Sequence, residues 1–316
     1  MASELAAMVP SSPKSWEWRG HRIGWSQEGS PNASRTVLLI HGFGANVHHW
    51  RHNSPVLAQE AEVFAIDLLG FGSSAKPPSQ LEGEVPLPGA VRYCFGLWAE
   101  QVADFVDSHV APHPHRKPYH LVGHSIGGVV ALASARLLCE RGNPPTQVVL
   151  IDCAQRTLDE KRIGELPLLQ QLTRPLLKRL VRGRWLTTSL FRFLARPAYI
   201  RRVLAVAYPS GANVDDELVA LLHQPSTDPG APESFRGFVN LFADLLAPDL
   251  LAELNVPVRM IWGGSDPWES PEEARRWLRE YAAVQELRVL DGLGHCPHDE
   301  APEQVNPILL EWLKAA

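Results

Sequence analysis

The chain has 316 residues, of which 45% are hydrophobic and 21% are charged, a composition typical of a globular protein with a sizeable core. Its net charge of −5 argues against nucleic acid as a general partner. The four cysteines form no CxxC pair, so the sequence predicts neither a disulfide framework nor a cysteine zinc site and favours a reducing compartment.

The beginning of the chain carries no recognisable targeting segment. Residues 1–14 have no basic stretch followed by a long apolar one, and we expect them to be disordered. No stretch approaches the roughly 18 consecutive apolar residues of a membrane-spanning helix. We therefore expect an intracellular protein, soluble or peripherally associated with a membrane, without a signal or transit peptide.

Strand-like and helix-like stretches alternate along the first half of the chain. Residues 16–25 alternate in the manner of a β-hairpin whose turn lies near Gly20. Continuous apolar runs predict strands buried on both faces, and apolar residues at helical spacing predict the helices between them. The expected strands are 36–40, 62–67, 119–122, 147–152, 256–264 and 286–290, and the expected helices cover 97–110, the run after Ser125, 271–282 and the stretch from Ala301.

The alternation stops from residue 154 to 247, where several helices are separated by prolines. We expect this stretch to be a helical cap inserted into a core formed by residues 15–153 and 248–316. Strands that alternate with helices form mostly parallel sheets. The predicted fold class is therefore α/β, with a mostly parallel, doubly wound sheet.

The central motif is the pentapeptide Gly123-His124-Ser125-Ile126-Gly127, which lies between an apolar strand and a helix-forming run. A serine between glycines in this setting is typical of a nucleophile elbow, a sharp turn that exposes the hydroxyl above the sheet. The strained turn needs small residues two positions before and after the serine, and the two glycines meet that need.

A serine nucleophile needs a histidine base, which in turn needs a carboxylate to orient it. In this fold the order along the chain is serine, acid, histidine. Asp266 and His295 each follow a late strand, so both should lie at the same sheet edge as Ser125. Asp152 competes with Asp266 as the acid, and His298 competes with His295 as the base.

The remaining predicted site residues surround Ser125. The N–H groups of Phe43 and Ile126 would form the oxyanion hole, while His41 supports the loop that carries Phe43. Trp50, Trp268 and Pro297 would line the substrate pocket. The sequence has no HExxH, His48-His49 lacks metal-ligand spacing, and we expect neither a metal nor a cofactor.

An aspartate at the elbow would indicate a dehalogenase or an epoxide hydrolase, whereas the serine implies acyl transfer to water. Ester hydrolysis is the simplest interpretation of this serine. Cleavage of a small soluble ester or of a carbon–carbon bond would use the same three residues. A binding protein that kept only the fold would instead have a blocked or misaligned pocket.

These motifs resemble those of the α/β-hydrolase superfamily from Trp16 onward, and more narrowly those of the pheophytinase and chlorophyll dephytylase group. The shared stretches are Trp18-Arg19-Gly20, His41-Gly42-Phe43-Gly44-Ala45, His49-Trp50-Arg51, Asp67-Leu68-Leu69-Gly70-Phe71-Gly72, Asp266-Pro267-Trp268 and Gly294-His295-Cys296-Pro297-His298-Asp299-Glu300-Ala301-Pro302. The resemblance implies hydrolysis of the phytyl ester of pheophytin or chlorophyll by Ser125, Asp266 and His295. The chain departs from the plant members in lacking a recognisable transit peptide.

A phytyl chain has about 20 carbons, so its burial is worth over about 10 kcal/mol as an upper bound and calls for an apolar pocket. Leucines and phenylalanines of the cap could supply it, or could simply pack the cap on itself. The cap is also basic. From Arg156 to Arg202 it carries twelve Lys or Arg and three Asp or Glu, which gives this segment a net charge of +9 and the remainder of the chain a net charge of −14. This basic stretch would either rest on an anionic membrane or form a solvated face.

Overall fold

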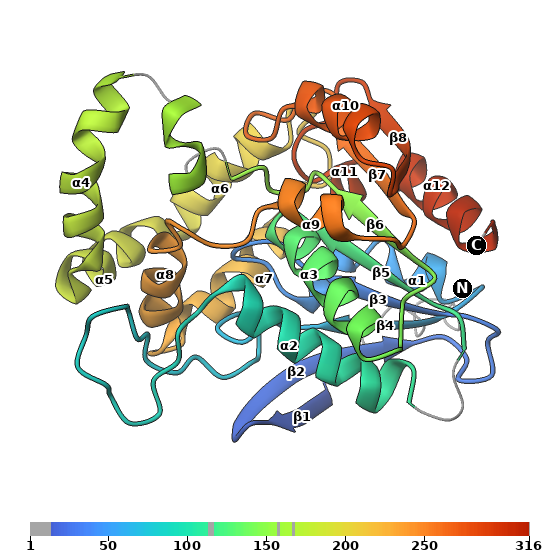
Figure 1. Ribbon diagram of the computed structural model, residues 1–316, viewed down its shortest axis with the longest axis horizontal. Coiled ribbons are helices and arrows are strands. Elements are labelled where there is room, and N and C mark those ends of the chain that lie inside the picture. The colour runs from blue at the N-terminus through green and yellow to red at the C-terminus, as the bar shows by residue number, and fades with distance from the viewer. Residues whose placement is uncertain (1–13, 113–116, 157–158, 166–167, 316) are drawn as a thin grey trace.

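The structure of the chain is a computed structural model that describes residues 14–112, 117–156, 159–165 and 168–315 (Figure 1). The N-terminal stretch predicted to be disordered lies outside these ranges, except that Lys14 begins the first strand. The side chains of Glu165, Leu168, Leu169, Gln170 and Leu172 are also outside the description, so the prediction that cap leucines bind substrate is not addressed at those positions.

The described residues form an eight-stranded sheet with the order β1-β2-β4-β3-β5-β6-β7-β8. From β4 to β8 the neighbouring strands are parallel, while β1 and β2 are antiparallel additions at one edge. The predicted mostly parallel α/β sheet is therefore confirmed. The strands are β1 (Lys14–Trp18), β2 (His21–Glu28), β3 (Thr36–Ile40), β4 (Glu62–Ile66), β5 (Tyr119–His124), β6 (Gln147–Ile151), β7 (Val258–Gly263) and β8 (Val284–Leu290).

The edge hairpin of β1 and β2 turns at Arg19 and Gly20, as the sequence predicts. Both residues have positive φ, at 50° and 77°. A two-residue turn with positive φ at both positions matches the right-handed twist of the strands it joins.

The inner strands are buried on both faces because helices cover both sides of the sheet. Along β3, Leu38 and Ile40 join the core under one layer of helices, while Val37 and Leu39 join the core under the other. This division follows from the strand's period of two. One layer contains α2 (Phe95–Phe105), α3 (Ile126–Glu140), α9 (Ala247–Glu253) and α10 (Pro271–Glu280), and the other contains α1 (Ser54–Leu57) and α12 (Pro302–Lys314).

Between β6 and β7 the chain leaves the sheet and forms helices, which lie to the left of the sheet in Figure 1. These are α4 (Leu168–Arg182), α5 (Arg184–Leu194), α6 (Pro197–Ala207), α7 (Asp216–His223) and α8 (Ala231–Val239). The chain rejoins the main core at α9, where Ala247 and Leu250 are buried. The predicted cap boundaries at residues 154 and 247 stay a prediction. Within the described ranges, no helix combines the length and apolar character needed to cross a membrane.

Strand β5 carries a buried histidine, His120, which should make folding stability depend on pH. Burial, and then the charges of Arg35 and Arg259, lower its pKa from 6.5 to about 4. The unfolded chain therefore binds more protons than the folded one between these values, so the contribution of His120 to stability is present above pH 6.5 and is lost as the pH falls toward 4. This loss amounts to about 2 kcal/mol by pH 5.

Replacing His120 with Gln, which does not titrate, should remove this dependence. We expect the unfolding free energy of His120→Gln, measured relative to the unaltered chain by urea denaturation, to rise by about 2 kcal/mol between pH 7.5 and pH 5. Taking the difference between the two proteins cancels the other titrating groups. A difference that stays constant over this range would contradict the prediction.

Candidate active site

Ser125 lies in the sharp turn between β5 and α3. Its φ of 54° and ψ of −121° form a conformation that is strained for a residue with a side chain. A Cβ atom added to Gly123 would lie 2.2 Å from the carbonyl oxygen of Gly127, and one added to Gly127 would lie 2.3 Å from that of Ile40. Both neighbours are backbone atoms that cannot move aside. The two glycines of the motif are therefore required by close backbone approach, as the sequence predicts.

His295 joins Ser125 to Asp266. Its Nε2 lies 3.1 Å from Ser125 Oγ, and its Nδ1 lies 2.7 Å from Asp266 Oδ2. Since a carboxylate only accepts, Nδ1 carries the proton in this contact and Nε2 is free to accept one from the serine. The structure thus brings together the three residues predicted as nucleophile, base and acid, from the loops that follow β5, β7 and β8.

Asp266 is held as an anion by its surroundings. Burial by itself would raise the pKa of Asp266, but the hydrogen bond and charge of His295, together with the N–H of Trp268, hold it below its usual value. Its Oδ1 also accepts hydrogen bonds from the N–H groups of Trp268 and Glu269, at 2.8 and 3.1 Å. The carboxylate is therefore fixed in position as well as in charge.

Asp152, the competing acid, lies beside Asp266, whereas the hydroxyl of Ser125 bonds His295. It is fully buried, and its Oδ1 accepts from the N–H of Gly263 at 2.9 Å. Burial, and then the negative charge of Asp266, raises the pKa of Asp152 well above its usual value. Of the two candidates, Asp266 makes the hydrogen bond to His295, and the surroundings of Asp152 favour its protonated form.

The loop after β3 approaches Ser125 closely enough to contribute to an oxyanion hole. A Cβ on Gly42 would lie 3.1 Å from the Cβ of Ser125, so this loop packs directly on the elbow. His41 braces it: Nε2 accepts from the N–H of Leu68 at 3.1 Å, and Nδ1 donates to the carbonyl oxygen of Gly42 at 2.7 Å. Within the described part of the chain, the N–H groups of Phe43 and Ile126 have no protein acceptor.

The three predicted pocket residues lie in different surroundings. Trp268 is 47% exposed, and its ring lies edge-on to that of His295 with centroids 4.9 Å apart. Pro297 is buried at the start of the short helix α11 (Pro297–Glu300). The prediction for Trp50 is wrong: its side chain is 1% exposed and packs in the core under α1 and α12, against His298. An indole on that side of the sheet fills the core and cannot meet a substrate above Ser125.

An aromatic wall lies beside the oxyanion loop and was not predicted from the sequence. Phe43, which is 41% exposed, stacks on Phe238 with centroids 3.9 Å apart and tilts against Phe235 at 6.3 Å. Phe235 and Phe238 are three positions apart on α8, so they lie on one side of that helix. This spacing was a usable signal, but only the fold shows that it faces Phe43.

Three buried histidines gather beneath the elbow. One ring nitrogen from each of His49, His124 and His298 lies within 4.8 Å of the others. Nε2 of His124 donates to the carbonyl oxygen of His295 at 2.8 Å, and His49 bonds the hydroxyl of Tyr208 at 2.9 Å. Burial lowers the pKa of all three and keeps them neutral.

Of these three histidines, His124 supports the backbone of His295 through its hydrogen bond. The pairing of His124 with that backbone is a long-range contact that the chain order does not reveal. Imidazole nitrogens are also common metal ligands. The expectation that the protein binds no metal therefore stays a prediction.

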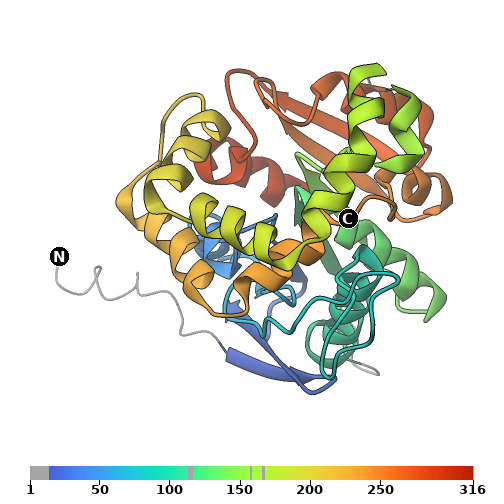
Figure 2. The same cartoon turned by 90° about the vertical axis from the view of Figure 1, so that its left-hand side faces the viewer.

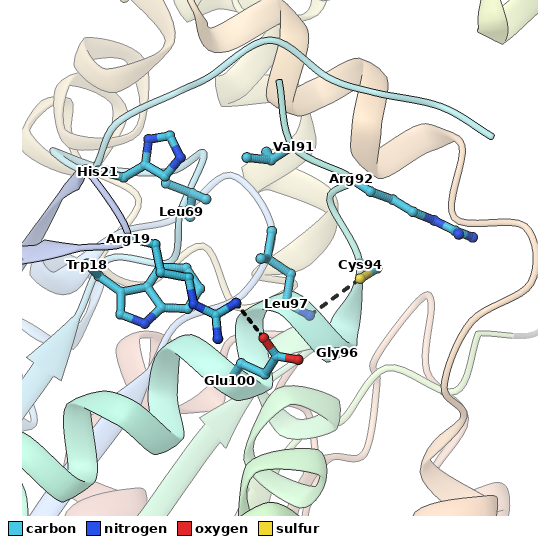
Figure 3. Close-up of a pocket in the computed structure, with 10 residues that line it drawn as sticks. All are labelled: Trp18, Arg19, His21, Leu69, Val91, Arg92, Cys94, Gly96, Leu97 and Glu100. Atoms are coloured by element: carbon cyan, nitrogen blue, oxygen red, sulfur yellow. Dashed lines mark hydrogen bonds and ion pairs between the residues drawn. The ribbon is translucent and has the colours of Figure 1, made fainter. Parts of the chain in front are cut away.

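A separate pocket of about 450 Å³ opens between the β1–β2 turn and the start of α2 (Figure 3). Arg19 and Glu100 form an ion pair across it at 2.6 Å, and the N–H of Leu97 donates to Cys94 Sγ. None of the residues named around Ser125 lines it. We therefore assign it no part in the chemistry described above.

Comparison with known proteins places this chain in a family. The chain matches the alpha/beta hydrolase family over residues 37–308 and belongs to it. Membership in this family indicates a hydrolase.

Two curated relatives show how varied the family is. The chain is 25% identical to a chloroplastic pheophytinase of Arabidopsis thaliana, over 98% of this chain and 68% of that protein. It is 26% identical to a 2-hydroxymuconate semialdehyde hydrolase of Pseudomonas sp. (strain CF600), over 89% of this chain and 87% of that one. Among solved structures, the epoxide hydrolase CorEH is similar with a TM-score of 0.73 at 20% identity, over 96% of this chain and 99% of that one, which shows the shared fold alone.

Proposed function

We propose that this chain is a serine-dependent carboxylic ester hydrolase whose substrate is the ester of a bulky hydrophobic alcohol, namely the phytyl ester of pheophytin or chlorophyll. The observation that carries the chemistry is the pair of hydrogen bonds by which His295 links Ser125 to Asp266. Support for the substrate comes from the similarity to pheophytinase and from the apolar side chains beside the serine.

In the first half of the reaction, Ser125 Oγ attacks the carbonyl carbon of the ester while His295 Nε2 takes the hydroxyl proton. The negative charge then develops on the former carbonyl oxygen, where the N–H groups of Phe43 and Ile126 can stabilise it. Asp266 stabilises the resulting imidazolium. His295 returns the proton to the departing alcohol oxygen, which leaves an acyl group on Ser125.

In the second half, water replaces the alcohol. His295 Nε2 takes a proton from the water as its oxygen attacks the acyl carbon, and the proton then goes back to Ser125 Oγ as the carboxylic acid leaves. Over the full cycle the proton of Ser125 leaves on the alcohol and a proton from water replaces it, so the three residues end in their starting protonation states. The mechanism uses side chains and backbone N–H groups of this chain and no cofactor.

The exposed aromatic side chains around the proposed machinery favour a hydrophobic substrate over a small polar one. Phe43 and Trp268 both carry large exposed apolar surfaces, and both lie next to a residue of the proposed machinery. Exposed aromatic rings at a reactive centre gain free energy by covering an apolar ligand. A long branched alcohol would cover more of this surface than a short one does.

A second candidate function is cleavage of a small soluble ester or of a carbon–carbon bond. It is favoured by the similarity to 2-hydroxymuconate semialdehyde hydrolase, which extends over most of both chains. The same three residues would serve, so only the substrate distinguishes this candidate from the first.

The test is release of free phytol from pheophytin and from chlorophyll by the purified protein, with a short-chain nitrophenyl ester assayed alongside. We expect phytol release that is lost in Ser125→Ala, because the alcohol can leave only after the serine attacks. Serine-dependent cleavage of the short ester without phytol release would remove the pigment assignment while keeping the hydrolase. Phytol release that persists in Ser125→Ala would contradict the mechanism.

A further inference from the structure

The helices α4, α5 and α6 form an outer layer that exposes large apolar side chains. Figure 2 shows them running across the side of the molecule that faces the viewer. Trp185 is 81% exposed and Leu176 is 63% exposed. We use the name outer helical face for six exposed residues of α4 and α5: Leu176, Leu177, Leu180, Trp185, Leu190 and Phe193.

These side chains are arranged in stripes and not scattered. Leu176 and Leu180 are four positions apart on α4, and Leu190 and Phe193 are three positions apart on α5. Residues at these spacings are neighbours on a helix surface. Exposed apolar residues that neighbour one another on each helix are typical of an interaction site and not of a solvated surface.

One side of α5 already packs against the rest of the cap, so the exposed apolar residues of the outer helical face are additional to those that α5 needs for packing. Phe191 packs on Phe235 of α8 with ring centroids 5.4 Å apart, and Thr187 is buried. Helix α5 therefore packs Phe191 and Thr187 inward while its other apolar residues, Trp185, Leu190 and Phe193, stay exposed. A helix pair that only stabilised the cap would need the packed side alone.

The same helices are strongly basic. Residues 168–207 contain eight arginines and one lysine and no aspartate or glutamate. Three of these cations pair with carboxylates from other segments: Lys178 with Glu160, Arg184 with Glu233, and Arg201 with Asp216. Among the residues that the structure describes, Arg192 on α5, Arg196 just before α6 and Arg202 on α6 have no carboxylate partner, so they leave these helices positively charged.

We propose that the outer helical face docks on the surface of an anionic lipid bilayer, with Trp185 and the leucines in the interface and the unpaired arginines against lipid phosphates. Apolar side chains beside arginines are the combination that binds a membrane surface without crossing it. Trp is also the side chain most suited to that depth.

A second copy of the chain is the alternative occupant of this face. In a symmetric dimer the same basic surface would meet itself, and like charges facing each other oppose association. An anionic bilayer has the complementary charge. The observations therefore favour lipid over self-association.

Docking of this face would also bring the membrane close to the proposed active site. Phe191 on α5 contacts Phe235 on α8, and Phe235 contacts Phe43 beside Ser125. Apolar side chains therefore continue from the docked layer to the oxyanion loop. This consequence rests on the proposed function, whereas the docking itself does not.

The test is co-sedimentation of the purified full chain with vesicles of phosphatidylcholine alone or with 30% phosphatidylglycerol, a proportion of roughly the size that gives a strongly negative surface. We expect binding to the anionic vesicles that weakens as salt is raised. Trp185→Ser should weaken it at least about tenfold, and the triple variant Arg192→Gln, Arg196→Gln, Arg202→Gln about 100-fold, since each basic residue contributes about one kcal/mol.

Matched controls lie on α10, away from this layer. Leu278→Ser removes an exposed leucine and Arg275→Gln removes an exposed arginine, and both should bind as the unaltered chain does. All variants should hydrolyse a short soluble ester at the same rate, which separates a failure of docking from a failure of the hydrolase. Equal vesicle binding by Trp185→Ser, by the triple variant and by the controls would overturn the proposal. The proposal would also be overturned if the unaltered chain formed a dimer but did not bind vesicles, and if Trp185→Ser abolished that dimer.

Discussion

Ser125→Ala is expected to lower kcat for ester hydrolysis by at least about 10⁴-fold, the scale seen when the nucleophile of a triad is removed. The oxygen that disappears lies 3.1 Å from His295 Nε2, and among the residues that the structure describes no other hydroxyl bonds that nitrogen. The measurement is the initial rate on a short-chain nitrophenyl ester, with folding checked by circular dichroism.

Ser134→Ala provides the matched control. Ser134 is buried in α3, and its hydroxyl donates to the carbonyl oxygen of Val130 at 2.7 Å, within the same helix. It should retain nearly full activity because it lies outside the hydrogen-bonded group around His295. A Ser125→Ala protein that is folded and within tenfold of full activity would end the proposed mechanism.

Asp266→Asn is expected to lower kcat by about 10³- to 10⁴-fold, whereas Asp152→Asn should cost less than about tenfold. Asn at 266 cannot hold the imidazolium by charge, and its amide can donate to Nδ1 and so select the wrong tautomer of His295. Asn at 152 replaces a carboxyl group whose surroundings favour the neutral form, keeps an oxygen for the N–H of Gly263, and offers a donor toward Asp266.

The two variants are compared through kcat at several pH values on the same soluble ester. If the carboxylate acts by stabilising the imidazolium, raising the pH should not restore the kcat of Asp266→Asn. If Asp152→Asn is the more damaging change, the acid of the mechanism moves to the end of β6 and the contact between Asp266 and His295 loses its proposed role.

Much of the fold was predictable because its signals are local. Continuous apolar runs such as residues 36–40 are buried on both faces, which requires helices on both sides of the sheet. The turn at Gly20 and the elbow glycines were also predictable, because their constraint is a backbone angle or a close approach of neighbouring chain segments. These features depend on residues that are close together in the sequence or on a single strand–turn–helix unit.

The sequence predicted which residues form the candidate site but not which of them contact one another. Chain order placed Ser125, Asp266 and His295 at one edge of the sheet and favoured Asp266 as the acid, with Asp152 as its competitor. The hydrogen bond from His295 Nδ1 to Asp266 is a contact that only the structure shows. Trp50 was predicted wrongly because it follows the oxyanion loop in sequence, while its side chain turns to the opposite side of the sheet.

The sequence by itself determined the parallel α/β sheet, the strained serine between two glycines, and the basic character of the stretch around α4 to α6. Each of these is set by residue type, spacing and chain order. Only the tertiary structure decided which acid contacts His295, that Phe43 stacks on Phe238, that three histidines lie beneath the elbow, and which side of α5 faces outward. The reason is physical: periodicity shows that a helix has an apolar side, but the neighbours of that side come from distant segments brought together by packing.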